Sequence, residues 1–260
     1  LKSELSRDSS YRSRLNELAR SYGYKNGLAD IAGKNLERVD NLARMMLYVL
    51  MNKIIFYKIL ETHYKLSPLK PFCKSVNYST SKYLETLKND YFNKAIAVTQ
   101  DFEPIFATGL FDELRLPDDA EVCKVIDDLI KLVDEVGATN IGDIIGYIYE
   151  QLIPVEERHQ FGQFYTPPAV ARLIVKWSVR KPTDVVLDPG CGSGTFLIEA
   201  YSRLYELKTG KTLREGRPSR EVHEAILNQL YSVDINTFPL HLTAMNLAMR
   251  NVRSPSSNMN

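Results

Sequence analysis

The chain has 260 residues, 44% hydrophobic and 25% charged, which is typical of a folded protein with one large domain or two ordinary ones. Its net charge of +1 excludes a globally basic nucleic-acid-binding protein, so any such surface must come from local clustering. The three cysteines, Cys73, Cys123 and Cys191, are widely spaced and odd in number. This pattern argues against a disulfide framework or a zinc site and fits a reducing, cytoplasmic setting.

The first sixty-five residues form two segments of different character. Residues 1–30 are polar and carry several arginines, which fits either a solvated terminal helix or a basic arm that touches phosphates. Residues 35–65 predict one long helix that is apolar on most sides, as in the core of a helical domain. Asn52, Lys53 and Lys58 interrupt its most apolar run, so we expect no membrane span.

The helical pattern continues to about residue 158. A loop is expected over 66–80 and helices over 81–100, 121–136 and 141–153. Asp118 or Asp119 is a candidate cap for the helix over 121–136, and Gly137 ends it. We find no convincing strand alternation before about residue 180, and therefore predict a helical N-terminal domain over residues 1–158.

The pattern changes at Thr166, which we expect to cap a helix that ends near Val179 and has Trp177 in the core. Short apolar strands then alternate with helices, which predicts an α/β domain with a parallel sheet. The expected strands are residues 184–188 and 230–234, and the expected helices end near 207, 228 and 250.

A glycine-rich turn follows the first of these strands. Residues 188–196 read D-P-G-C-G-S-G-T-F, and a helical pattern begins at once. Strand, glycine turn and helix together are a general arrangement for holding a nucleotide-like ligand, because glycine lets the backbone approach closely. The spacing does not match G-x-G-x-x-G, which argues against a nicotinamide or flavin dinucleotide.

The turn, together with G-Q-F-Y-T-P at residues 162–167, resembles the S-adenosylmethionine (SAM) motifs of the N6-adenine DNA methyltransferases. This family includes type I modification subunits and fused type IIG enzymes. Two further segments resemble the same family: N-K-I-I-F at 52–56, followed by L-E at 60–61, and G-Y-I-Y-E at 146–150. N-K-I-I-F fits the core helix of any bundle equally well.

The resemblance implies that residues 159–260 are part of a Rossmann-like SAM-dependent methyltransferase domain. It also implies SAM as the cofactor and double-stranded DNA as a partner, in a restriction–modification system with specificity and restriction subunits or fused domains. The expected reaction is methylation at adenine N6, and the residues do not separate it from cytosine N4.

The resemblance also implies roles for individual residues. Asp188 would lie near the methionine end of SAM, and the glycines would let the backbone approach the ligand. Asp234, at the end of the second strand, would bind the ribose hydroxyls, the alternative being a helix-cap aspartate. The predicted cofactor-binding residues are Phe164, Tyr165, Thr166, Pro167, Asp188, Gly190, Gly192, Ser193, Gly194, Thr195, Asp234 and Ile235.

The catalytic motif of the family is missing from the sequence. These enzymes use (N/D)-P-P-(Y/F) after the fourth strand, whereas the only Pro-Pro here is Pro167-Pro168. We therefore assign no catalytic residue and no metal ligand. We expect an amino-terminal part of a methyltransferase that is inactive alone, with the catalytic strand beyond Asn260. Two alternatives stay open: a non-catalytic SAM-binding or helical scaffold module, and a methyltransferase for protein or RNA.

Overall fold

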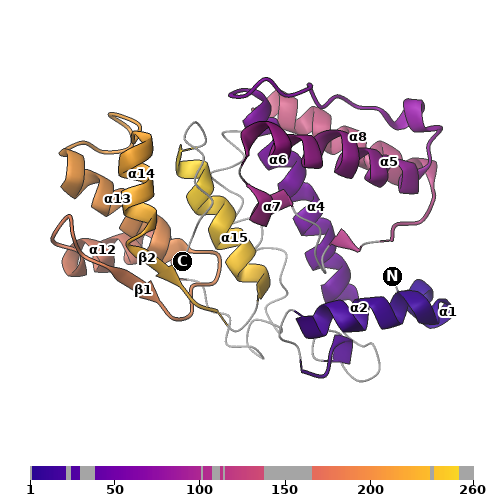
Figure 1. Cartoon of the computed structure of the whole chain (residues 1–260), viewed down its shortest axis with the longest axis horizontal. Coiled ribbons are helices and arrows are strands. Elements are labelled where there is room, and N and C mark those ends of the chain that lie inside the picture. The colour runs from indigo at the N-terminus through magenta and orange to yellow at the C-terminus, as the bar shows by residue number, and fades with distance from the viewer. Residues whose placement is uncertain are drawn as a thin grey trace. The chain divides into compact units, whose positions relative to one another are not determined.

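The protein is mostly helical and has one small sheet (Figure 1). The computed structural model describes residues 2–21, 25–29, 39–100, 102–106, 112–113, 115–137, 166–234 and 237–251. The chain divides into two compact units. Unit 1 comprises Leu1–Glu61, Leu66–Ala95 and Phe106–Ala138, and unit 2 comprises Thr62–Lys65, Ile96–Ile105 and Thr139–Asn260. The predicted boundary at 158/159 lies outside the described residues and stays a prediction.

The helices and strands agree closely with the sequence periodicity. In chain order they are α1 (Lys2–Arg7), α2 (Ser9–Ser21), α4 (Val39–Glu61), η1 (Cys73–Val76), α5 (Thr80–Thr86), η2 (Leu87–Phe92), α6 (Asn93–Thr99), α7 (Glu103–Phe106), α8 (Ala120–Val136), α12 (Pro168–Ser178), β1 (Val186–Asp188), α13 (Thr195–Thr209), α14 (Arg220–Leu227), β2 (Leu230–Ser232), α15 (Thr237–Ala248) and η4 (Met249–Asn251). The helix expected over residues 81–100 is a continuous run of α5, the π-helical η2 and α6. The helix expected over 141–153 lies outside the described residues.

Helix α4 is the central element of unit 1, and α8 packs against it (Figure 1). From Asn52 to Leu60 every side chain of α4 is buried, which confirms the predicted core helix. At the start of α8, the side chain of Asp119 accepts a hydrogen bond of 2.8 Å from the backbone N–H of Glu121. Gly137 ends α8 with φ of +86°, a backbone conformation that favours glycine.

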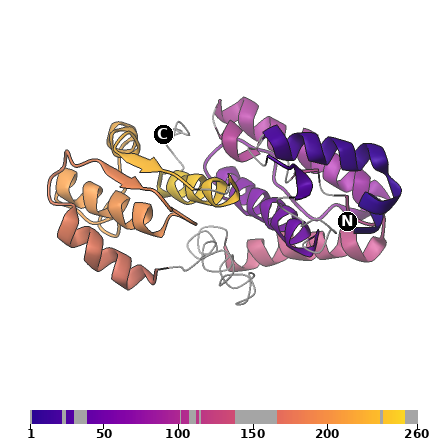
Figure 2. The same cartoon turned by 90° about the horizontal axis from the view of Figure 1, so that it is seen from below.

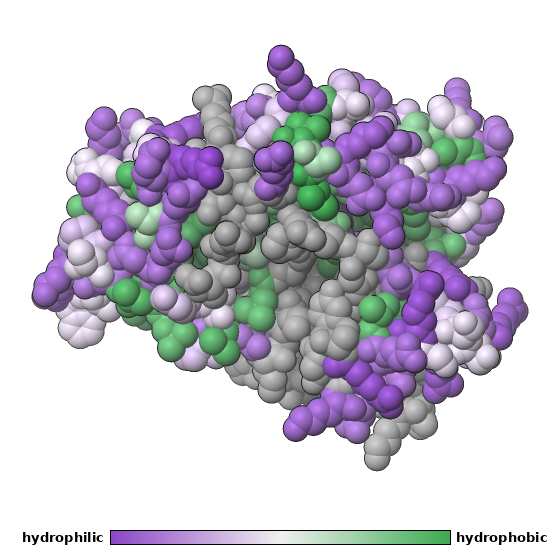
Figure 3. All heavy atoms as spheres, viewed as in Figure 1, coloured by the Kyte–Doolittle hydropathy of each residue, from purple (hydrophilic) through white to green (hydrophobic). Residues whose placement is uncertain are grey.

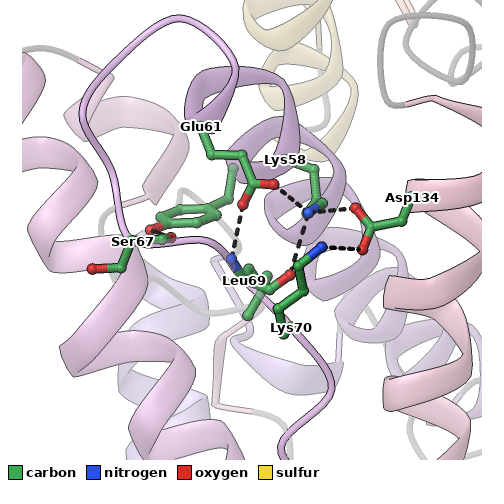
Figure 4. Close-up of polar contacts among 7 residues, drawn as sticks. Lys58, Glu61, Ser67, Leu69, Lys70 and Asp134 are labelled. Atoms are coloured by element: carbon green, nitrogen blue, oxygen red, sulfur yellow. Dashed lines mark hydrogen bonds and ion pairs between the residues drawn. The ribbon is translucent and has the colours of Figure 1, made fainter.

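A buried lysine joins three segments of unit 1 (Figure 4). Lys58 of α4 is 3% exposed, forms ion pairs with Glu61 and with Asp134 of α8, and donates a 3.2 Å hydrogen bond to the Leu69 carbonyl. Burial alone would lower the pKa of Lys58, but the hydrogen bonds to Asp134 and Glu61 outweigh it and raise the pKa. The Glu61 carboxylate also accepts the N–H of Leu69, at 2.8 Å. The segment of α4 that resembles a family motif therefore contributes to the packing of unit 1.

The sheet of unit 2 consists of β1 and β2, which run parallel with Leu187 opposite Tyr231. Helix α13 packs on both strands and α12 lies along α13 (Figure 2). Helices α14 and α15 also contribute to the buried core of unit 2, which is made by Val175, Val179, Cys191, Leu197, Ala200, Tyr201, Leu204, Tyr205, Ile226, Leu227, Leu230 and Leu247. The two strands are the ones predicted, each shorter by two residues. Their parallel pairing brings both carboxyl ends to the same edge of the sheet.

The other face of the sheet is exposed: Val185 and Leu187 are 65% and 61% accessible, and Tyr231 and Val233 are also open to solvent. Figure 3 shows hydrophobic side chains at the surface in this region, at the lower left of the view. Trp177 of α12 is 75% exposed, so its predicted place in the core is wrong. The helical repeat places Ala171 and Val175 on the buried side of α12, and a residue two positions after Val175 faces away from them.

Candidate functional site

The glycine turn joins β1 to α13 at the carboxyl end of the sheet, and the backbone fixes it to β2. The N–H of Cys191 donates to the Val233 carbonyl at 3.0 Å, and the N–H of Val233 donates to the Asp188 carbonyl at 3.0 Å. Gly192 and Gly194 have φ of +52° and +90°, where a side chain would strain the backbone. The sequence therefore needs glycine at these two places to make the turn.

Two carboxylates meet the turn from the ends of the two strands. The Oδ2 atom of Asp234 accepts the N–H of Gly192 at 3.0 Å, although the residues are 42 positions apart. The Oδ1 atom of Asp188 accepts the N–H of Gly190 at 3.2 Å. Parallel strands end at the same edge, which is where open α/β sheets bind ligands. The two predicted acidic site residues and the predicted glycines are thus in one place.

The second oxygen of Asp188 is unusual. Oδ2 is buried and has no hydrogen-bond partner among the described residues. Burial raises the pKa of Asp188 above its ordinary value, the Gly190 N–H opposes this rise, and the Asp234 carboxylate adds to it. A buried acceptor without a partner lowers the stability of the folded protein. A cationic donor beside Oδ2 would remove this cost and lower the pKa of Asp188 again.

Cys191 has no role as a nucleophile in this site. Its side chain is buried, and burial raises the pKa of the thiol to about 11. The reactive thiolate is therefore scarce at neutral pH.

Two residues of α15 contact the turn although neither is a predicted site residue. Thr243 and Asn246 donate hydrogen bonds to turn carbonyls, each at 2.9 Å. Both are buried on a helix that is otherwise largely apolar, and they are three positions apart, on the same side. A pair of polar residues at that spacing was the sequence signal that could have found them.

The remaining predicted site residues are only partly placed. Ser193 is buried within the turn and Thr195 begins α13. Pro167, and not Thr166, occupies the cap position of α12, without a side-chain cap bond, so the predicted threonine cap is wrong by one residue. Thr166 and Pro167 lie just before the first residue of α12, and their contact with the cofactor stays a prediction. The last three predicted residues, Phe164, Tyr165 and Ile235, lie outside the described residues.

Metal-binding clusters and membrane-spanning helices are both absent from the part of the chain that the structure describes. No cluster of three His, Cys, Asp or Glu side chains there is arranged to hold a metal ion. None of the described helices has both the length and the apolar character needed to cross a membrane.

Comparison with known proteins finds a family similar to the part of the chain that holds this site. Residues 140–260 match the model of the N-6 DNA Methylase family. The matched residues include the glycine turn and the two acidic strand ends.

The curated relatives are restriction–modification methylases. The match to the type I restriction enzyme EcoEI methylase subunit of Escherichia coli is 29% identical over 113 residues, 43% of this chain and 21% of that protein. The MjaVII methylase subunit of Methanocaldococcus jannaschii is 30% identical over 125 residues, 45% of this chain and 22% of that protein. The type II enzyme RM.BcgI of Heyndrickxia coagulans is 25% identical over 122 residues, 46% of this chain and 18% of that protein. The matched region thus spans about a fifth of the length of these relatives.

A solved structure is also similar. The modification subunit of a type I restriction enzyme from Vibrio vulnificus YJ016 aligns with 95% of this chain and 55% of its own, at 18% identity and a TM-score of 0.42.

Proposed function

We propose that the glycine turn and its two carboxylates bind SAM, and that the chain is part of a DNA methyltransferase of a restriction–modification system. The observation that carries the proposal is the hydrogen bond of 3.0 Å between the Gly192 N–H and Asp234. It places a carboxylate from the end of β2 directly against a glycine turn at the end of β1, within a segment of the N-6 DNA methylase family.

The residues present fit the chemistry of SAM. Its methionine part carries an ammonium group, and the buried Oδ2 of Asp188 is an acceptor that needs such a cationic donor. Its ribose carries two hydroxyls, and Asp234 is the acceptor at the end of the neighbouring strand. Gly192 and Gly194 allow the backbone to approach the ligand without a Cβ.

The fold and the remaining site residues complete the proposal. We infer a Rossmann-like SAM domain over 159–260 after a helical domain over 1–158, with Phe164, Tyr165, Thr166 and Pro167 covering the methionine end and Ile235 beside the adenine. Bound SAM supplies an activated methyl group. In this site Asp188 and Asp234 hold the two ends of the cofactor, and the turn fixes its orientation.

The substrate and partners follow from the family. We propose that the target is adenine N6 in double-stranded DNA, and that specificity and restriction functions come from further subunits or domains. We assign no catalytic residue within these 260 residues, since no (N/D)-P-P-(Y/F) segment occurs in them. We therefore expect cofactor binding, and no methyl transfer, from this chain by itself.

Calorimetry with SAM tests the proposal. The wild-type chain should bind SAM, and Asp234→Ala should weaken binding, because the substitution removes a carboxylate that contacts both the turn and, as proposed, the ribose. Asp127 of unit 1 accepts hydrogen bonds from the backbone of Phe72 and Cys73, so Asp127→Ala is a control in which a carboxylate with a structural role is lost elsewhere. Equal affinity for SAM in the wild type and Asp234→Ala would contradict the assignment.

A further inference from the structure

Helix α15 is attached to the glycine turn by two side chains. The hydroxyl of Thr243 donates to the Gly192 carbonyl, and the amide of Asn246 donates to the Ser193 carbonyl, both at 2.9 Å. The two donors are 1% and 3% exposed. A third contact is steric, because a Cβ added at Gly194 would lie 2.9 Å from the Thr243 hydroxyl oxygen.

These bonds fix the orientation of two successive peptide groups. A trans peptide places its C=O and N–H on opposite sides, so a Gly192 carbonyl held against α15 turns the Ser193 N–H away from that helix. Left-handed glycines such as Gly192 and Gly194 have many alternative backbone conformations, and the turn would otherwise sample them. The bonds also satisfy carbonyls that would be costly to leave buried and unpaired.

We propose that Thr243 and Asn246 are positioning residues for SAM, which hold the backbone of the glycine turn in its ligand-binding conformation without touching the ligand. The inference rests on the proposed function of the turn. The two side chains cap successive carbonyls from one face of α15, so the helix sets the conformation of the turn before the ligand arrives. Pre-ordering a loop strengthens binding because less conformational entropy is lost when the ligand binds.

The test compares two substitutions at one position. Thr243→Val has nearly the same shape as threonine and removes the donor, whereas Thr243→Ser keeps the hydroxyl and is the matched control. Affinity for SAM is measured by calorimetry at a temperature at which each variant, checked by thermal unfolding, is fully folded. Hydrogen exchange of the amides of residues 190–195, measured without SAM, reports the mobility of the turn directly. Asn246→Ala makes the same comparison at the second bond if Thr243→Val does not fold.

We expect Thr243→Val to weaken SAM binding by about tenfold and Thr243→Ser by less than about threefold. Amide exchange in the turn should be faster in Thr243→Val than in Thr243→Ser. A purely structural role would lower the melting temperature and leave the affinity of the folded protein unchanged, and that result overturns the inference. Equal weakening by Val and Ser also overturns it, because the hydroxyl is then not the cause. If the wild-type chain does not bind SAM, the proposed function itself fails and the inference falls with it.

Discussion

Replacing Asp188 by asparagine should affect the stability of the protein and its affinity for SAM in opposite directions. Asparagine keeps an oxygen for the Gly190 N–H, which Asp188 accepts at 3.2 Å, and replaces the charged Oδ2 by a neutral group. That Oδ2 is buried without a partner among the described residues. The substitution thus removes an uncompensated charge at the end of β1 and keeps the shape of the side chain.

The expected effects on binding and on stability have opposite signs. In our proposal the ammonium of SAM donates to Asp188, and losing a hydrogen bond between charged groups costs about 2 kcal/mol, or about thirtyfold in Kd. Without SAM, Asp188→Asn should be at least as stable as the wild type at pH 7. The pKa of Asp188 is raised in the folded protein, so ionisation of this group opposes folding as the pH rises through that pKa. Towards pH 3, where Asp188 is mostly protonated in both states, the difference in stability should become small.

Calorimetry with SAM and thermal unfolding between pH 3 and pH 8 measure the two effects. Asp184→Asn, two residues before the start of β1, is the matched control. Its carboxylate accepts the N–H groups of Arg180 and Lys181, both at 2.8 Å, which lowers the pKa of Asp184. The control should therefore lose stability above the ordinary pKa of an aspartate and keep its affinity for SAM.

Two results would refute this reasoning. Unchanged affinity for SAM in Asp188→Asn would show that Asp188 does not contact the cofactor. A clear loss of stability in Asp188→Asn at pH 7, in the absence of SAM, would show that the ionised carboxylate has a stabilising partner, contrary to its environment in the structure.

Three further predictions concern other parts of the chain. Gly194→Ala should destabilise the protein by more than about 1 kcal/mol in urea unfolding, because φ is +90° and the new Cβ would contact Thr243. Gly190→Ala is the control and should be tolerated, because a Cβ at Gly190 has no atom within 4 Å. Asp134→Asn should lower the free energy of unfolding by about 1–3 kcal/mol, since Lys58 is buried beside it. Burial alone would raise the pKa of Asp134, but its hydrogen bonds with Lys58 and Lys70 outweigh burial and lower the pKa. The stabilisation by Asp134 is therefore present above about pH 4 and is lost as the pH falls through the folded-state pKa. A loss of stability in Asp134→Asn that did not depend on pH would contradict this direction of the pKa shift. Fluorescence of Trp177, the single tryptophan, should be readily quenched by acrylamide, and protection from quenching would show that this face of α12 is covered.

Much of unit 2 could be predicted because each signal in its sequence is local. Apolar runs bounded by polar residues define the two strands, and glycine spacing defines the turn. The proximity of Asp188 and Asp234 can be predicted from their positions at the ends of two parallel strands, because parallel strands end at the same edge of a sheet. In unit 1, the limits of α8 are likewise set by local signals, the cap at Asp119 and the stop at Gly137.

Other features depend on which residues meet in space, and the sequence indicates them only indirectly. The Thr243 and Asn246 bonds connect segments about fifty residues apart, and each residue alone is an ordinary polar side chain in a helix. Trp177 is an example, because tryptophan is usually well buried, whereas here Ala171 and Val175 set the rotation of α12 and leave Trp177 exposed. The Asp134 partner of Lys58 likewise comes from a different helix, 76 positions along the chain.

An NMR titration of the ¹⁵N-labelled chain with SAM tests most directly whether the glycine turn is the cofactor site. We predict saturable shifts of the backbone amides of residues 188–196 and of Asp234, at the two strand ends, and none of comparable size in α4 or α8. NAD⁺ serves as the control ligand, because the glycine spacing does not match a dinucleotide site. Saturable SAM shifts confined to unit 1, equal shifts with NAD⁺, or no shifts at the turn would contradict the assignment of this turn to SAM.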